Sequence, residues 1–138
     1  MALWLFKSEP DCYSYANLVT DRATDWDGVA NALAQKHLRA VKKGDRVFFY
    51  HTGDEKAIVG VMQAAGDPKP AADDEKGKQV VIPVKPIRKL KTPVTLAAIK
   101  AEGTFADWEL IRISRLSVMP VSEERWKRIE EMSQMLSE

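Results

Sequence analysis

The 138-residue sequence has little of the two residue types that most often bind metals, with one cysteine, Cys12, and two histidines, His37 and His51. A single cysteine excludes an internal disulfide framework and an all-cysteine metal site, and it favours a reducing compartment such as the cytoplasm. No acid or cysteine stands at a familiar ligand spacing from either histidine, so no metal and no other cofactor is expected.

Clustered glycines and long apolar runs are also missing. The seven glycines are scattered singly, whereas a phosphate-cradling loop needs several together, so nucleotide hydrolysis is not expected. The apolar run at residues 2–6 ends at a lysine and is too short for a signal peptide or a membrane-spanning helix. We therefore expect no membrane among the partners of this chain.

Neither sign of charge dominates the chain, whose net charge is +1. The distribution is uneven, because seven basic residues and no acid lie between Lys76 and Lys100. This basic stretch is either a phosphate-contacting face or a solvated strand edge on which lysines prevent aggregation. Its basic residues are Lys76, Lys78, Lys85, Arg88, Lys89, Lys91 and Lys100.

Hydrophobic periodicity and capping residues predict one domain of the α+β class over residues 1–138. Short helices are expected after four N-caps, Ser14, Asn31, Thr95 and Ser122. Strands are expected at residues 3–6, 79–87 and 115–121, with a hairpin over 44–66 and a surface loop over 67–78. Both faces of the first hairpin strand are apolar, which favours a curved, barrel-like sheet.

Trp26 is unusual because it lies between two aspartates, directly before a glycine and away from any long apolar run. Other polar and aromatic residues are expected at neighbouring strand ends and turns. An indole face for stacking, with amide, hydroxyl and amine groups for the edge of a ring, suits a planar ligand such as a nucleobase. The candidates are Lys7, Ser8, Glu9, Trp26, Asn31, Tyr50, His51 and Thr52.

Each candidate also has a purely structural interpretation, in which Trp26 is a core residue and Asn31 only caps its helix. Two other functions stay open. Ser8, Glu9 and His51 lie near predicted strand ends and could meet as a hydrolytic triad, although no glycine-flanked serine elbow surrounds Ser8. The same pocket could instead take a small molecule or a protein segment.

The chain resembles a known family, the EVE domain, over nearly its whole length. The motifs that carry the resemblance are WLFKSEP at 4–10, WDGVAN at 26–31, LRAVKKGD at 38–45, VFFYHT at 47–52, IVGVM at 58–62 and RLSVMPVSEERW at 115–126. The resemblance implies a PUA-like fold, a small curved barrel of about five or six strands with short helices packed around it. This fold is related to the YTH domains that read methylated adenine in RNA.

The resemblance also implies a non-enzymatic module that reads a modified base, a modified cytosine or adenine, in DNA or RNA. Trp26 would then be a wall of the base pocket, to which Phe105, Arg115 and Ser117 would add. Arginines that are common in the family are replaced here by Ala30 and Gln35. The basic stretch therefore becomes the better candidate for phosphate contacts.

The free energies of base extrusion and stacking limit how such a pocket would work. Extruding a base from a duplex costs a few kcal/mol, and stacking on Trp26 would return about 1 to 3 kcal/mol. Because these terms roughly cancel, hydrogen bonds from Asn31, Ser8 and their neighbours must supply the specificity. The hypothesis requires the indole to lie open at the mouth of a cavity.

Overall fold

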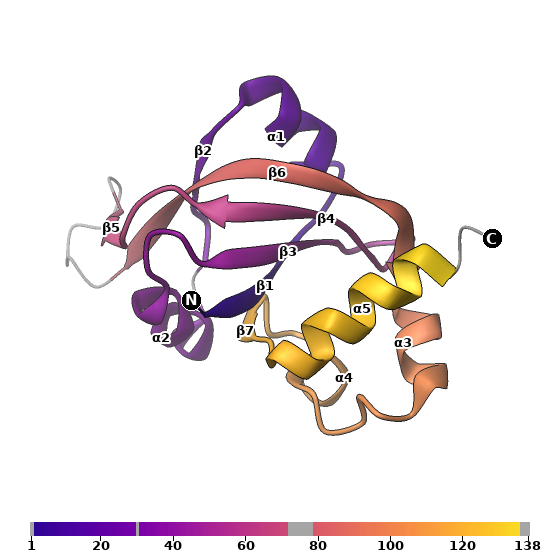
Figure 1. Cartoon of the computed structure of the whole chain (residues 1–138). Helices are drawn as coiled ribbons and strands as arrows, with labels where there is room; N and C mark the ends of the chain where they lie inside the picture. Colours follow the sequence, from indigo (N-terminus) through magenta and orange to yellow (C-terminus); the bar gives the residue numbers. More distant parts are fainter. Residues whose placement is uncertain (1, 30, 72–78, 136–138) are drawn as a thin grey trace.

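The computed structural model of the chain describes residues 2–29, 31–71 and 79–135. Six strands form one strongly curled sheet, a half-barrel (Figure 1). Their order across the sheet is β2 (Thr24–Trp26), β6 (Val80–Thr95), β4 (Ala57–Ala64), β3 (Arg46–His51), β1 (Leu3–Ser8) and β7 (Val118–Pro120). A short strand, β5 (Lys69–Pro70), pairs with β6. In this sheet β1 and β3 run parallel, and the other neighbours are antiparallel.

The helices of the described chain lie around this sheet. They are α1 (Tyr15–Asp21), α2 (Ala32–Ala40), α3 (Leu96–Glu102), α4 (Glu109–Arg112) and α5 (Glu123–Met135). Figure 1 shows α1 beside β2 and β6 on one side, and α3, α4 and α5 grouped on the other. Within the described residues, none of these helices is long and apolar enough to cross a bilayer.

The predicted α+β class and curled, PUA-like sheet are confirmed, and so are all four helix N-caps. The side-chain oxygens of Ser14, Asn31, Thr95 and Ser122 each accept a hydrogen bond from the backbone N–H three residues further on. These caps were predictable because each bond joins groups within one turn of the chain.

Several features of the sheet and its connections differ from the prediction. β5 lies within the predicted surface loop of 67–78, whose residues 72–78 are outside the described residues, and the strand predicted over 115–121 is confined to β7. Both β2 and α4 were missed, because three or four residues give no measurable periodicity. The prediction of a strand that ends at residue 87 was also wrong, since β6 continues to Thr95. Its pairing with β4 shifts register beside Gly60 and again between Val61 and Met62, and such irregular pairing accommodates prolines that a regular ladder would exclude.

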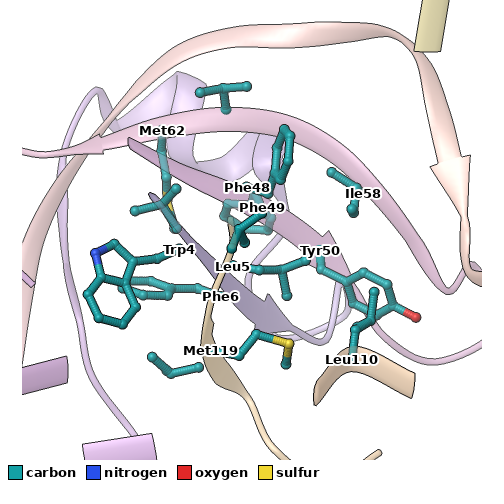
Figure 2. Close-up of a cluster of buried hydrophobic side chains, with 14 of the residues drawn as sticks. Trp4, Leu5, Phe6, Phe48, Phe49, Tyr50, Ile58, Met62, Leu110 and Met119 are labelled. Carbon is teal, nitrogen blue, oxygen red and sulfur yellow. The ribbon is translucent and has the colours of Figure 1, made fainter. Parts of the chain in front are cut away.

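The core consists of aromatic and long aliphatic side chains packed against the sheet (Figure 2). Leu5 and Phe6 of β1 and Phe48 and Phe49 of β3 are completely buried. Consecutive residues of these strands point to opposite faces, so both faces of the sheet are covered here. The two apolar faces predicted for the first hairpin strand are therefore confirmed.

One aromatic side chain, Tyr15, fixes α1 to the sheet. Its backbone N–H donates to His51 Nε2 at 3.0 Å, and its hydroxyl donates to the carbonyl oxygen of Val61 at 2.8 Å. The ring meets Phe49 edge to face, with centroids 5.4 Å apart. The same ring covers Gly60, where a Cβ would lie 2.6 Å from ring carbons.

Gly60→Ala tests this attachment. The added methyl cannot fit under the Tyr15 ring, so we expect the free energy of unfolding to fall by about 1 to 3 kcal/mol, measured by urea denaturation. In a Tyr15→Leu background the planar ring is gone, and the same substitution should cost much less. Equal costs in the two backgrounds would show that Tyr15 is not the constraint.

Candidate functional site

A hollow of about 490 Å³ lies where β1 ends, beside β2 and the turn that follows it. Lys7 and Ser8 line it from β1, Trp26 and its neighbours line it from β2, and Ser117 lines it from the segment before β7. The volume lies within the range of about 300 to 1,000 Å³ that is usual for small-ligand pockets. We call this hollow the base pocket, because it lies where the base-binding site was predicted from the sequence.

Backbone pairing and one turn bring these segments together. The backbone N–H of Lys7 donates to the carbonyl oxygen of Ser117 at 2.8 Å, which joins β1 to the start of β7. The Ser8 hydroxyl donates to the carbonyl oxygen of Tyr13 at 2.6 Å and so closes the turn after β1. Trp26 arrives from the far edge of the curled sheet, where it pairs with Ile82 of β6.

Trp26 is more buried than the sequence suggested. Its side chain is only 6% exposed and packs against Phe6 and Phe49, at centroid distances of 5.4 and 5.2 Å. The expectation of an indole that lies open at a cavity mouth is therefore wrong as to exposure, although the residue does line the pocket. Trp26 thus borders the hollow while Phe6 and Phe49 pack against its indole.

Lys7 is the cation of the base pocket. Its ammonium donates to the carbonyl oxygen of Ser114 at 3.0 Å and lies 5.5 Å from the centre of the Tyr50 ring. Burial lowers the pKa of Lys7 below its usual value. An ammonium group has three N–H donors, so the bond to Ser114 leaves donors for a ligand.

Carboxylates border the base pocket on the β2 side. Asp25 and Asp27 flank Trp26 and both line the hollow. Asp25 forms an ion pair with Lys69 at 3.0 Å, in which both side chains are about half exposed, so this pair contributes little to stability. Neither aspartate was among the predicted site residues, although their position beside Trp26 was the available signal.

Four other predicted site residues lie near the pocket without lining it. Asn31 uses its side-chain oxygen as the cap of α2, and Tyr50 is buried beneath Lys7, where Figure 2 shows its ring in the core cluster. Glu9 accepts, through its carbonyl oxygen, the backbone N–H groups of the turn after β1. Thr52 donates its backbone N–H to the carbonyl oxygen of Ser8 at 2.9 Å.

His51 lies in a different hollow, and both of its ring nitrogens are engaged. Nε2 accepts from the backbone N–H of Tyr15 at 3.0 Å, so Nδ1 carries the proton and donates to Glu55 at 2.6 Å. The Ser8 hydroxyl is bonded to Tyr13 instead. The hypothesis of a Ser8, Glu9 and His51 triad is thus contradicted, because a nucleophile and its base must share a hydrogen bond.

The two remaining candidates lie away from the base pocket. Phe105 is buried against Trp108, with centroids 5.7 Å apart, and borders a separate depression beside Arg125. Arg115 is exposed in the turn before β7. The structure does not bring either side chain into the lining of the base pocket.

Comparison with known proteins identifies the family. The sequence profile of the EVE domain matches residues 2–132. This chain belongs to the EVE domain family. Human thymocyte nuclear protein 1 is 27% identical over 157 aligned positions, which cover 89% of this chain and 70% of the human protein.

Solved structures agree with this assignment of the EVE domain. A protein from Rhodopseudomonas palustris has a TM-score of 0.93 and 42% identity, covering 100% of this chain and 97% of the other. Human THYN1, solved in complex with DNA that contains 5-methylcytosine, has a TM-score of 0.89 and 25% identity, covering 97% and 98% of the two chains. The YTH domain of MmI1, at 11% identity and a TM-score of 0.62, shares the fold.

Gln35 has a structural role in this EVE domain, at one of the two positions where arginine was expected. Its amide nitrogen donates to the carbonyl oxygen of Val29 at 2.6 Å, and its amide oxygen accepts from the backbone N–H of Val80 at 2.9 Å. The side chain is buried and ties α2 to β6. The other position, Ala30, lies outside the described residues, as do Lys76 and Lys78 of the basic stretch.

The buried Tyr50 phenol predicts a loss of stability at alkaline pH. Burial raises the pKa of Tyr50 to about 12, whereas an exposed phenol ionises near pH 10. The unfolded chain therefore loses this proton first, and the Tyr50 contribution to the free energy of unfolding should fall as pH rises from about 10 to about 12.

A series of urea denaturations from about pH 9 to about pH 12 measures this effect. Tyr50→Phe is the matched control, because it keeps the ring and removes the ionisable hydroxyl. As pH rises through this range, the free energy of unfolding of the wild type should fall relative to that of Tyr50→Phe. If the free energies of unfolding of the two proteins changed in parallel with pH, burial of Tyr50 would not be the cause of the alkaline loss of stability.

Proposed function

We propose that this EVE domain binds DNA that carries a modified cytosine, and that the modified base leaves its stack to enter the base pocket. The observation that supports this most strongly is the likeness to human THYN1, whose structure holds 5-methylcytosine-containing DNA. The pocket has the volume of a small-ligand site and opens between strand ends. In this proposal the domain is a binding module without catalytic activity.

The polar lining of the base pocket complements the edge of a cytosine. Lys7 and the hydroxyl of Ser117 supply hydrogen-bond donors for the O2 and N3 acceptors of that base. Asp25 and Asp27 supply carboxylate acceptors, and a carboxylate is the usual partner of the cytosine N4 amine. The same carboxylates disfavour thymine, which presents a carbonyl oxygen at that position.

Trp26 contributes apolar surface at the pocket wall rather than a free stacking face, because its side chain is 6% exposed. A buried methyl group adds only about 0.8 kcal/mol, and extruding the base costs a few kcal/mol. Hydrogen bonds in the pocket and contacts to phosphates must therefore supply most of the affinity. In this proposal Lys7, Asp25, Asp27 and Ser117 supply the specificity for cytosine over other bases.

Calorimetric titration tests the proposal. We expect short oligonucleotides with one 5-methylcytosine to bind more tightly than identical ones with cytosine, and affinity to fall with added salt. Lys7→Met should weaken binding about tenfold or more, because a hydrogen bond to a charged donor is lost. Lys127→Met removes the same charge from exposed α5 and should leave affinity within about twofold of wild type.

Three outcomes would contradict the proposal. Equal affinity for methylated and unmethylated strands would remove the modified base as the ligand. Equal losses from Lys7→Met and Lys127→Met would remove the base pocket as the site. Salt-independent binding of free nucleosides, with no gain from a strand, would favour the alternative of a small-molecule site.

A further inference from the structure

A second hollow, of about 740 Å³, lies between α1 and the second half of β6. We propose that this flanking groove holds the nucleotide next to the modified one on the same strand, an inference that rests on the proposed function. The strand would place one base in the base pocket and lay its neighbour across the groove.

The floor of the flanking groove is apolar and open to solvent. Val19 of α1 is 53% exposed and Ile87 of β6 is 36% exposed, and both line it. Pro86 and Pro93 add flat, rigid surface from β6. Exposed apolar side chains gathered in one hollow are a common sign of a binding site, and a base or a sugar ring packs on such a surface.

The two hollows lie on either side of one short segment of chain. Tyr13 lines the base pocket, and its neighbour Ser14 lines the flanking groove. Consecutive Cα atoms are about 3.8 Å apart. In addition, Ser8 in the base pocket pairs with His51 in the groove across adjacent strands. The two hollows are therefore adjacent, as sites for two neighbouring nucleotides of one strand must be.

Charge favours a nucleotide over an uncharged apolar ligand. Lys89 and Arg88 line the groove, and Lys85 and Lys91 are exposed on the same strand. Arg88 is held by Glu130 at 2.8 Å, whereas Lys89 forms no ion pair within the described part of the chain. The acid that lines the groove, Glu55, is hydrogen-bonded to His51. Lys89 is therefore the cation available to a phosphate beside the apolar floor.

The experiment compares a lysine that lines the groove with a lysine of β6 that does not. Affinities are measured for 5-methyl-2′-deoxycytidine monophosphate and for DNA oligonucleotides extended by one nucleotide on the 5′ or the 3′ side. We expect extension on one side to tighten binding about fivefold or more, since base packing is worth that much. Lys89→Ala should reduce this gain in affinity, because a phosphate contact is lost, and lower the salt slope by about 1.

Lys91→Ala is the matched control, because Lys91 is exposed on the same strand and does not line the groove. This variant should keep the full gain in affinity that comes from extending the oligonucleotide on one side. Val19→Ser, which removes apolar surface from an exposed site, should reduce the gain without changing affinity for the mononucleotide. Thermal denaturation checks that each variant folds as the wild type does.

The possible failures are distinct. Equal effects of Lys89→Ala and Lys91→Ala, or equal gains on both sides of the base, would overturn the flanking groove and leave the proposed function standing. An apolar peptide that binds the groove without competing with the oligonucleotide would overturn it too. No binding of any methylated oligonucleotide by wild type would instead overturn the proposed function.

Discussion

The anchoring of Tyr15 to the sheet is the interaction on which both hollows depend. Its backbone N–H binds His51, its hydroxyl binds the carbonyl oxygen of Val61, and its ring occupies the space over Gly60. Residues 13–15 are held there as the wall between the base pocket and the flanking groove.

The two hollows differ in chemistry because different parts of the sheet line them. The base pocket collects polar groups from the ends of β1 and β2, including a lysine whose pKa is lowered by burial. The flanking groove collects exposed apolar groups and cations from α1 and β6. Hydrogen bonds to the edge of one base and packing against its neighbour are complementary ways to hold a single strand.

Part of the site could be predicted from the sequence. Lys7, Ser8, Trp26 and Ser117 were proposed together, and all four line the base pocket. His51 was proposed with them and lies instead in the groove, because its side chain binds Tyr15 whereas that of Ser8 binds Tyr13. No sequence pattern shows which of two adjacent strand ends a turn will cover.

The sequence by itself determined four helix starts, the buried strands β1, β3 and β4, and the family. Caps and periodicity act between residues a few positions apart, so they can be found along the chain. Only the tertiary structure decided how far Trp26 is exposed, since its neighbours Phe6 and Phe49 come from other strands. The shape of a pocket follows from packing between distant segments, and no local signal encodes it.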